Sequence, residues 1–166
     1  MTTLTTPTRI AARDLMSREV AAVDPAMSLA ELATFLEDRG ISGALVRDTS
    51  GRPVGVVSVS DVASSETLAG RTPDTVTHRA AFYSQSWEAE FDDYDLRRIR
   101  IEESELTVGD LMTPEVVTVP AEATVAEVAR TMLGQHIHRV FVSEGAEIVG
   151  LVSTTDLLGV LAGDEE

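Results

Sequence analysis

The sequence predicts an α/β (α+β) protein that contains two tandem β-α-β-β-α repeats, packed through their sheets with pseudo-two-fold symmetry. Two observations predict this fold class. The same order of residues occurs twice along the 166-residue chain, and in each copy short apolar runs alternate with helical patterns. A single copy of about 50 residues would bury too little surface to be stable alone, so we expect the copies to share a core.

A nearly constant spacing relates the two copies. The residues DLM at 14–16 recur at 110–112, an offset of 96, and GVVSVSD at 55–61 recurs as GLVSTTD at 150–156, an offset of 95. The offset changes by one because the turn near 48–53 differs in length from its counterpart. A register held over about fifty residues is hard to obtain by chance, so the chain contains an internal duplication.

In the first copy each element has its own sequence signal. Ser28 and Glu31 are spaced as a capping box at a helix start, and Gly40 can adopt the left-handed conformation that ends a helix. The turn residues that follow separate two short apolar runs. In chain order we expect a strand at 20–23, a helix from Ser28 to Gly40, strands at 44–46 and 54–57, and a helix at 61–63 that Ser58 caps.

The second copy repeats these signals, with Thr124 and Glu127 as its capping box. The helix after Thr124 has an apolar face at helical spacing, formed by Val125, Val128, Ala129, Met132 and Leu133. In chain order we expect a strand at 116–119, this helix, strands at 140–142 and 148–152, and a helix at 156–161 that Ser153 caps.

Composition excludes several classes of function. The net charge is −15 and all 13 basic residues are arginine, so the field repels nucleic acid and anionic lipid. There is no cysteine to form a disulfide, a thiolate zinc site or a nucleophile. His136 and His138 lack a third ligand, so we expect no metal site. No signal peptide or membrane-spanning run is recognisable, so we expect a cytoplasmic protein.

The repeats divide the chain into five segments. We expect an N-terminal tail at 1–11, a first repeat at 12–63, an inter-repeat segment at 64–106, a second repeat at 107–162 and an acidic tail at 163–166.

The inter-repeat segment is expected to be partly helical. It holds five of the seven aromatic residues, whereas a disordered linker is poor in them: Phe82, Tyr83, Trp87, Phe91 and Tyr94. We expect a flexible loop at 64–77, then a helix at about 79–90 that packs on the repeats, on a partner subunit or in a cleft. The acidic residues at 88–95 are interpreted as a solvated turn, because they lack the glycine and terminal glutamate of an EF-hand loop.

These motifs together resemble the cystathionine β-synthase (CBS) domain family. The resemblance rests on the DLM opening, the strand-proline-helix step and the Gly-x-x-Ser-x-x-Asp end of each copy, and it covers residues 12–63 and 107–162. It implies two CBS units that form a disc, whose clefts bind AMP, ADP, ATP, S-adenosylmethionine or NAD. It also implies that the final Asp binds the ribose hydroxyls, while the Ser contacts ribose or phosphate.

Carried onto this sequence, the resemblance implies two unequal sites. Ile137, His138 and Arg139 resemble a strand of the γ subunit of the AMP-activated kinase, in which the His and Arg help to hold phosphates. The first copy has no basic side chain there, so we expect the better phosphate site in the second. The implied second-site residues are Val117, Thr118, Val119, Ile137, His138, Arg139, Ser153, Thr155 and Asp156. The implied first-site residues are Ala22, Val23, Ile41, Ser58, Ser60 and Asp61.

The chemistry of Ser-x-x-Asp allows two interpretations. A carboxylate can accept two hydrogen bonds from a ribose cis-diol, and a serine at a helix start lies among free N–H groups that suit a phosphate. The same pattern is also an ordinary helix cap, which stabilises a helix by about 1 kcal/mol. Sequence alone leaves both open.

The function expected from these features is that of a regulatory sensor without catalytic activity. No nucleophile-base arrangement, Walker loop or dinucleotide fingerprint is present. The expected ligand is an adenine nucleotide of the AMP, ADP or ATP type, with or without Mg²⁺, and no cofactor is required. A homodimer with an unidentified protein partner is expected. The alternatives are a dimerisation or docking module without a ligand, and a binder of S-adenosylmethionine or NAD.

Overall fold

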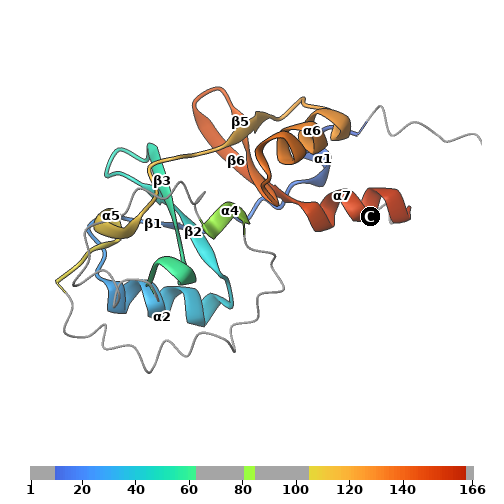
Figure 1. The fold of residues 1–166 in the computed structure, drawn as a ribbon. Helices are drawn as coiled ribbons and strands as arrows, with labels where there is room; N and C mark the ends of the chain where they lie inside the picture. The colour runs from blue at the N-terminus through green and yellow to red at the C-terminus, as the bar shows by residue number, and fades with distance from the viewer. Residues whose placement is uncertain (1–9, 63–80, 85–104, 164–166) are drawn as a thin grey trace, which may run out of the picture. The chain divides into compact units, whose positions relative to one another are not determined.

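The computed structural model describes residues 10–62, 81–84 and 105–163, which belong to two compact units (Figure 1). The first-repeat unit comprises residues 21–116, and the second-repeat unit comprises residues 1–20 together with 117–166. Each unit contains one three-stranded sheet with helices beside it. The mixed α/β class that the sequence predicts is confirmed. Among the described residues, no helix is long and apolar enough to cross a membrane.

The helices and strands lie close to the predicted positions. The first-repeat unit contains β1 (Ala22–Val23), α2 (Leu29–Arg39), β2 (Gly43–Arg47), β3 (Pro53–Ser58), α4 (Ala81–Ser84) and α5 (Val108–Leu111). The second-repeat unit contains α1 (Ala12–Leu15), β4 (Thr118–Pro120), α6 (Val125–Gln135), β5 (Arg139–Glu144), β6 (Glu147–Ser153) and α7 (Thr154–Ala162). After β3 the chain is helical at 59–62, where this part of the description ends.

The two sheets have the same topology. In each, the short first strand pairs parallel with the second, and the second pairs antiparallel with the third. Gly51 and Gly145 adopt positive φ angles of 84° and 62° in the turns of the two hairpins. Each hairpin has a register shift at the corresponding place, after Val46 and after Val142. The duplication seen in the sequence is therefore a duplication of backbone geometry.

Both predicted capping boxes are present. The Glu31 N–H donates to Ser28 Oγ at 3.2 Å, and the Ser28 N–H donates to Glu31 Oε2 at 2.9 Å. Thr124 and Glu127 form the same pair of bonds at 3.2 and 2.7 Å. Hydrogen bonds from the capping residue hold the pKa of each glutamate below its ordinary value. These reciprocal bonds satisfy N–H groups that a helix start leaves without partners.

The helices α2 and α6 each bury one face. In the first-repeat unit α2 packs Leu29, Leu32 and Leu36 against the sheet. In α6, Val125, Val128 and Met132 are buried, but Leu133 is 75% exposed. Leu133, which the helical spacing assigns to the apolar face, lies two residues before the end of α6 and is exposed to solvent.

Each unit is completed by the DLM segment that precedes the other repeat. In the first-repeat unit, Val56 and Thr113 exchange backbone hydrogen bonds of 2.9 Å in both directions. In the second-repeat unit, Ser17 and Leu151 do the same at 2.8 and 3.0 Å. The segments that contain α1 and α5 are therefore exchanged between the two sequence repeats, because each packs in the unit of the repeat that it does not precede.

The recurring glycines Gly55 and Gly150 make this exchange possible. A Cβ on Gly55 would lie 2.6 Å from the Thr113 oxygen and 3.1 Å from the Met112 sulfur. A Cβ on Gly150 would lie 2.6 Å from Cγ of Met16. Only glycine allows the methionine of each DLM segment to approach so closely, which explains why both motifs recur together.

The inter-repeat segment is described only at α4, whose Phe82 and Tyr83 are buried in the first-repeat unit. The predicted loop at 64–77, the acidic residues at 88–95 and the remaining aromatics lie outside the described residues. The two tails are described only at residues 10, 11 and 163.

Candidate functional site

In the second-repeat unit, strand register brings the implied site residues to one end of the sheet. Arg139 at the start of β5 pairs with Ser153 at the end of β6, because these strands are antiparallel. The strand β4 is parallel to β5 with Thr118 opposite Phe141, so Val117 is at the same end as Arg139. Residues that are 36 positions apart in sequence, such as 117 and 153, therefore lie at one sheet end.

At this end the helix α7 begins with a complete cap. The N–H and hydroxyl of Ser153 donate to Oδ2 of Asp156 at 2.7 and 3.0 Å, and the Asp156 N–H approaches Ser153 Oγ at 3.4 Å. The helix-cap role of Ser-x-x-Asp is therefore present in the structure. Both bonds to the carboxylate use the same oxygen, and among the described residues none donates to Oδ1 of Asp156. The cap therefore does not use this second oxygen.

A short clip joins the start of α7 to the start of β5. The carbonyl of His138 accepts hydrogen bonds from the N–H of Thr154 at 2.8 Å and from its hydroxyl at 3.0 Å. The side chain of His138 is exposed. These bonds therefore fix the backbone at His138, while the residue remains exposed.

The implied second-site residues differ in how far a ligand could reach them. Val117, Val119 and Ile137 are between 3 and 8% exposed, so their side chains belong to the core. Thr118, His138 and Thr155 are exposed, and Arg139, Ser153 and Asp156 are half-buried. The accessible groups thus combine a guanidinium, hydroxyls and a carboxylate at a helix N-terminus, which is a set suited to a sugar phosphate.

The first-repeat unit has the same strand pairing and the same Ser-x-x-Asp cap, but its capping serine is more deeply buried. Gly43 pairs with Ser58, and the N–H and hydroxyl of Ser58 donate to Oδ2 of Asp61 at 2.7 and 3.1 Å. Ser58 is fully buried. Burial raises the pKa of the Asp61 carboxyl, and the hydrogen bonds from Ser58 offset only part of this rise. Ala22, Ile41 and Ser60 are half-buried, and Val23 is in the core.

Phe82, for which the sequence left the packing partner open, lies against the first strand-to-helix junction. The ring of Phe82 approaches Gly43, so that a Cβ on Gly43 would lie 2.6 Å from Cδ2 of the ring. The signal available in the sequence was the concentration of aromatic residues between the repeats, which left open where they pack.

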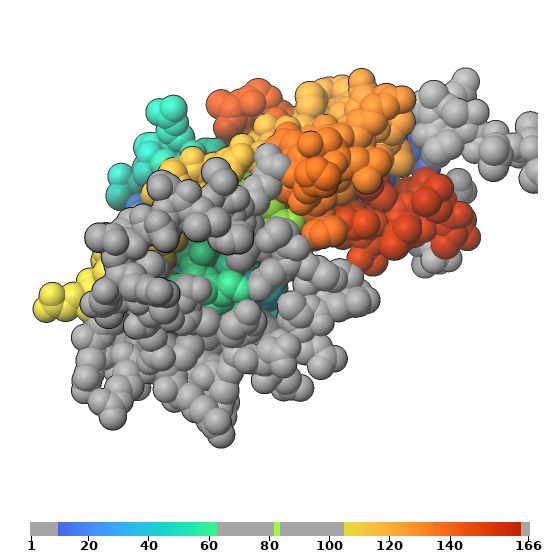
Figure 2. Space-filling view, in the orientation of Figure 1, coloured from blue at the N-terminus to red at the C-terminus, as the bar shows by residue number. Residues whose placement is uncertain are grey.

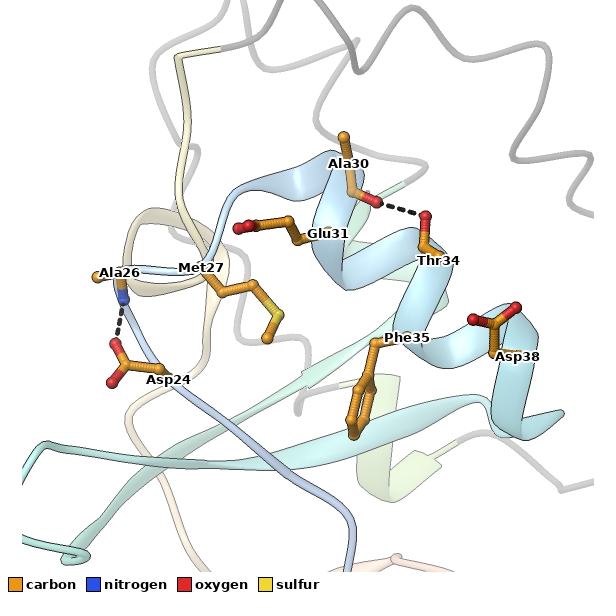
Figure 3. Close-up of a pocket in the computed structure, with 8 residues that line it drawn as sticks. All are labelled: Asp24, Ala26, Met27, Ala30, Glu31, Thr34, Phe35 and Asp38. Atoms are coloured by element: carbon orange, nitrogen blue, oxygen red, sulfur yellow. Dashed lines mark hydrogen bonds between the residues drawn. The ribbon is translucent and has the colours of Figure 1, made fainter.

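One surface groove lies beside α2, and its lining contains none of the implied site residues (Figure 3). It has a volume of about 810 Å³, and the side chains of Met27 and Phe35 project toward it. Asp24, Glu31 and Asp38 add three carboxylates to the lining. Because carboxylates repel phosphate, this groove does not suit a nucleotide.

A second groove of about 530 Å³ lies between α6 and α7, which Figure 2 shows in orange and red. Its lining contains no acidic residue, lysine or arginine, and consists of Ala129, Met132, Leu133, His136, Ile137, His138, Thr154, Leu157, Leu158 and Leu161. Leu133, Leu158 and Leu161 are 75, 57 and 77% exposed. This groove is therefore an apolar surface next to the implied nucleotide site. In the described part of the chain, no three His, Asp or Glu residues are placed to hold a metal ion.

Comparison with known proteins gives a sequence relative and solved structures of similar fold. Uncharacterized protein MK0525 of Methanopyrus kandleri is 21% identical over 148 residues, which are 89% of this chain and 60% of that protein. This chain thus spans less than two thirds of that relative's length. The structure of CBSX2 in complex with AMP has a TM-score of 0.64 at 19% identity and covers 94% of this chain and 98% of its own.

A second structure, the CBS domain pair of protein MJ0100 in complex with 5′-methylthioadenosine and S-adenosyl-L-methionine, has a TM-score of 0.62. It is 20% identical, and the match covers 93% of this chain and 98% of that one. A family model of the CBS domain matches residues 12–66 and 108–163, well over half of the sequence. The chain therefore belongs to the CBS domain family and contains two CBS domains.

Proposed function

We propose that this chain is a regulatory, non-catalytic CBS pair that binds an adenine nucleotide at its second repeat. The observation that carries the proposal is the pairing of Arg139 with Ser153 beside the start of α7. The guanidinium and the N–H groups of the first turn of α7 would bind phosphate, and Oδ1 of Asp156 would accept from the ribose hydroxyls. Exposed Thr118 lies toward the same sheet end.

The charge of the protein is compatible with such a ligand. The net charge of −15 repels an anion at long range, but the field is screened beyond a Debye length of about 8 Å. Local donors therefore decide binding. The complexes of CBSX2 with AMP and of MJ0100 with adenosyl compounds support the choice of an adenosine-containing ligand.

Thermal unfolding with a ligand panel tests this proposal. The panel is AMP, ADP, ATP, S-adenosylmethionine and NAD, each with and without Mg²⁺. A ligand at 100 times its Kd stabilises the folded state by about 2.7 kcal/mol. AMP, ADP or ATP is expected to raise the melting temperature. If no compound does so, the sensor function is wrong and a module without a ligand is favoured.

Matched variants then locate the site. Asp156→Ala should abolish the ligand-induced shift, whereas Asp61→Ala should leave most of it. Both variants remove the same capping geometry, since each carboxylate accepts the same two bonds from a serine. Each ligand-induced shift in melting temperature is measured against the same variant without ligand, so the stability lost with the cap cancels. Equal loss in both variants would contradict the assignment to the second repeat.

The proposal includes a homodimer formed through the groove between α6 and α7. A second copy of this face is the occupant that fits, because three exposed leucines surround a lining without carboxylates, whereas the protein as a whole is strongly acidic. Two copies can meet here with little charge repulsion and bury apolar surface.

Sedimentation equilibrium measures the oligomeric state of the wild type and of a variant with a charged side chain introduced on that face. Leu158→Glu should convert a dimer into a monomer, and Thr49→Glu in the exposed turn after β2 is the control that should not. A dimer unaffected by Leu158→Glu would show that another surface joins the copies, and a monomeric wild type would exclude the dimer.

A further inference from the structure

In the first-repeat unit, an aromatic ring occupies the place that corresponds to Arg139 in the second. Gly43 pairs with Ser58 as Arg139 pairs with Ser153, so Gly43 and Arg139 are equivalent positions. A Cβ on Gly43 would lie 2.6 Å from Cδ2 and 3.1 Å from Cε2 of Phe82. Such distances are too short for two carbon atoms. The missing side chain at Gly43 therefore makes room for this ring.

The ring of Phe82 is held in place by its neighbour. The helix α4 has only four residues, and a helix this short has no stability of its own. Phe82 is 2% exposed and Tyr83 is fully buried, and the two rings meet edge to face with centroids 5.1 Å apart. The hydroxyl of Tyr83 donates to the carbonyl of Glu115 at 3.1 Å. Packing and this hydrogen bond together fix α4 on the sheet.

The polar groups of the first repeat are correspondingly less accessible than their counterparts. Ser58 is fully buried, whereas Ser153 is half-buried in the equivalent cap. The backbone around the two caps is the same. The Val59 N–H donates to the Ser42 carbonyl at 2.8 Å, and the Thr154 N–H donates to the His138 carbonyl at the same distance. Ser58 and Ser153 therefore differ in exposure because of the residues that cover each cap, and not because of the cap geometry.

We infer that Phe82 is a specificity-determining residue that occupies the first repeat's candidate site, so that the chain binds one nucleotide rather than two. The ring excludes a ligand from the space over Gly43, and the described residues 41–46 around it include no basic side chain that could attract a phosphate. The occlusion of the first site stands on the geometry above, and the count of one nucleotide rests on the proposed function.

Thiol labelling tests the occlusion without any ligand. Because the chain has no cysteine, Ser58→Cys and Ser153→Cys each introduce a single thiol at equivalent positions of the two caps. A thiol reacts with Ellman's reagent only when the reagent reaches it. We expect the thiol at position 58 to react at least about tenfold more slowly than the thiol at 153, since it reacts only after local opening.

Adding changes at position 82 shows whether the ring is the cause. Phe82→Ala combined with Ser58→Cys should raise the labelling rate to within about threefold of that at position 153. Phe82→Leu, which retains apolar bulk, should keep labelling slow, and Tyr83→Phe should give an intermediate rate. Denaturant unfolding identifies the variants that fold cooperatively.

Two results would overturn the occlusion. One is equal labelling of positions 58 and 153 with Phe82 in place, a comparison that does not depend on whether Phe82→Ala folds. The other is slow labelling at position 58 that persists when Phe82→Ala is added and the variant still folds. If Phe82→Ala does not fold, the corresponding result is a labelling rate at position 58 that Tyr83→Phe leaves unchanged.

Titration calorimetry with AMP tests the consequence for binding. One AMP per wild-type chain, lost in Asp156→Ala, is expected. Two AMP per chain would overturn this inference while the proposed function stands. No binding of any panel ligand, with slow labelling at 58, would overturn the proposed function and leave the occlusion intact.

Discussion

The two repeats have the same backbone arrangement, but they differ in how accessible the start of the last helix is to solvent. Both sheets share one register, both end in a Ser-x-x-Asp cap, and both receive a DLM segment across a glycine. At one equivalent position the first repeat has Gly43 beside a buried ring, and the second has half-buried Arg139. Duplication thus retained the backbone, while a single position and a ring from outside the repeat changed the chemistry of the surface.

The largest expected effect concerns that position. Gly43→Ala should lower the free energy of unfolding by about 2–3 kcal/mol, because overpacking a filled site forces neighbours apart. The new Cβ would meet Phe82 and also the Val57 oxygen at 2.8 Å. Urea unfolding measures the change. Arg139→Ala is the control and should cost less than about 1 kcal/mol. Equal costs in the two variants would contradict the difference between the repeats.

A smaller loss is expected from the cap of the second repeat. Ser153→Ala should lower the free energy of unfolding by about 1 kcal/mol, because the side chain that accepts from the first turn of α7 is removed. Chemical denaturation measures it. Ser17→Ala, at an exposed position, is the control and should be nearly neutral. A neutral Ser153→Ala would mean that the serine is kept for a ligand rather than for the helix.

Two helical glycines of the second repeat should give a gain. Gly134→Ala in α6 and Gly159→Ala in α7 should each raise the free energy of unfolding by about 0.5–1 kcal/mol, since alanine is the better helix former. A Cβ at either position meets no atom within 4 Å. Thermal unfolding of the double variant should show additive gains. A loss at Gly159 would indicate that a partner surface packs there.

The smallest effect is a difference in pH dependence between the repeats. Burial raises the pKa of Asp61 above 3.8, so the folded chain keeps this proton to a higher pH than the unfolded chain does. The free energy of unfolding should therefore fall as pH rises from 3.8 through the raised pKa. Asp61→Asn should remove this fall in urea titrations between about pH 3.5 and 7.

The capping glutamates act in the opposite sense and cancel in this comparison. The pKa values of Glu31 and Glu127 are below 4.5, so their stabilisation is present above that pH and is lost as pH falls through the lowered values. Both groups are unchanged in Asp61→Asn. Identical pH profiles for this variant and the wild type would show that the burial of Asp61 has no energetic consequence.

Local signals in the sequence predicted most of the fold. Ser28, Glu31 and Gly40 predicted the limits of α2, which begins at Leu29 and ends at Arg39. The central strands were predicted within one residue at most ends, because apolar runs and turn residues are local features. The first strand of the second repeat was less well placed, since β4 begins at Thr118 rather than at 116 and includes Pro120.

What the sequence could not predict depends on contacts between distant residues. The exchange of DLM segments, the burial of Phe82 against Gly43 and the exposure of Leu133 each depend on which element packs where. The end of α6 is a local exception, because His136 takes the left-handed position with a φ of 55° that glycine usually occupies. The candidate site was assembled in outline from the motif, but its accessibility was not predictable.

The exchange of segments also constrains how the chain can fold as it leaves the ribosome. The first-repeat unit needs Thr113 against Val56 and Val108 against Met27, contacts that span 57 and 81 residues of sequence. When residue 62 has been synthesised, its sheet is complete but its covering segment does not yet exist. Folding of the first half must therefore wait for synthesis to pass Thr113, which favours long-range closure over domain-by-domain folding and slows it.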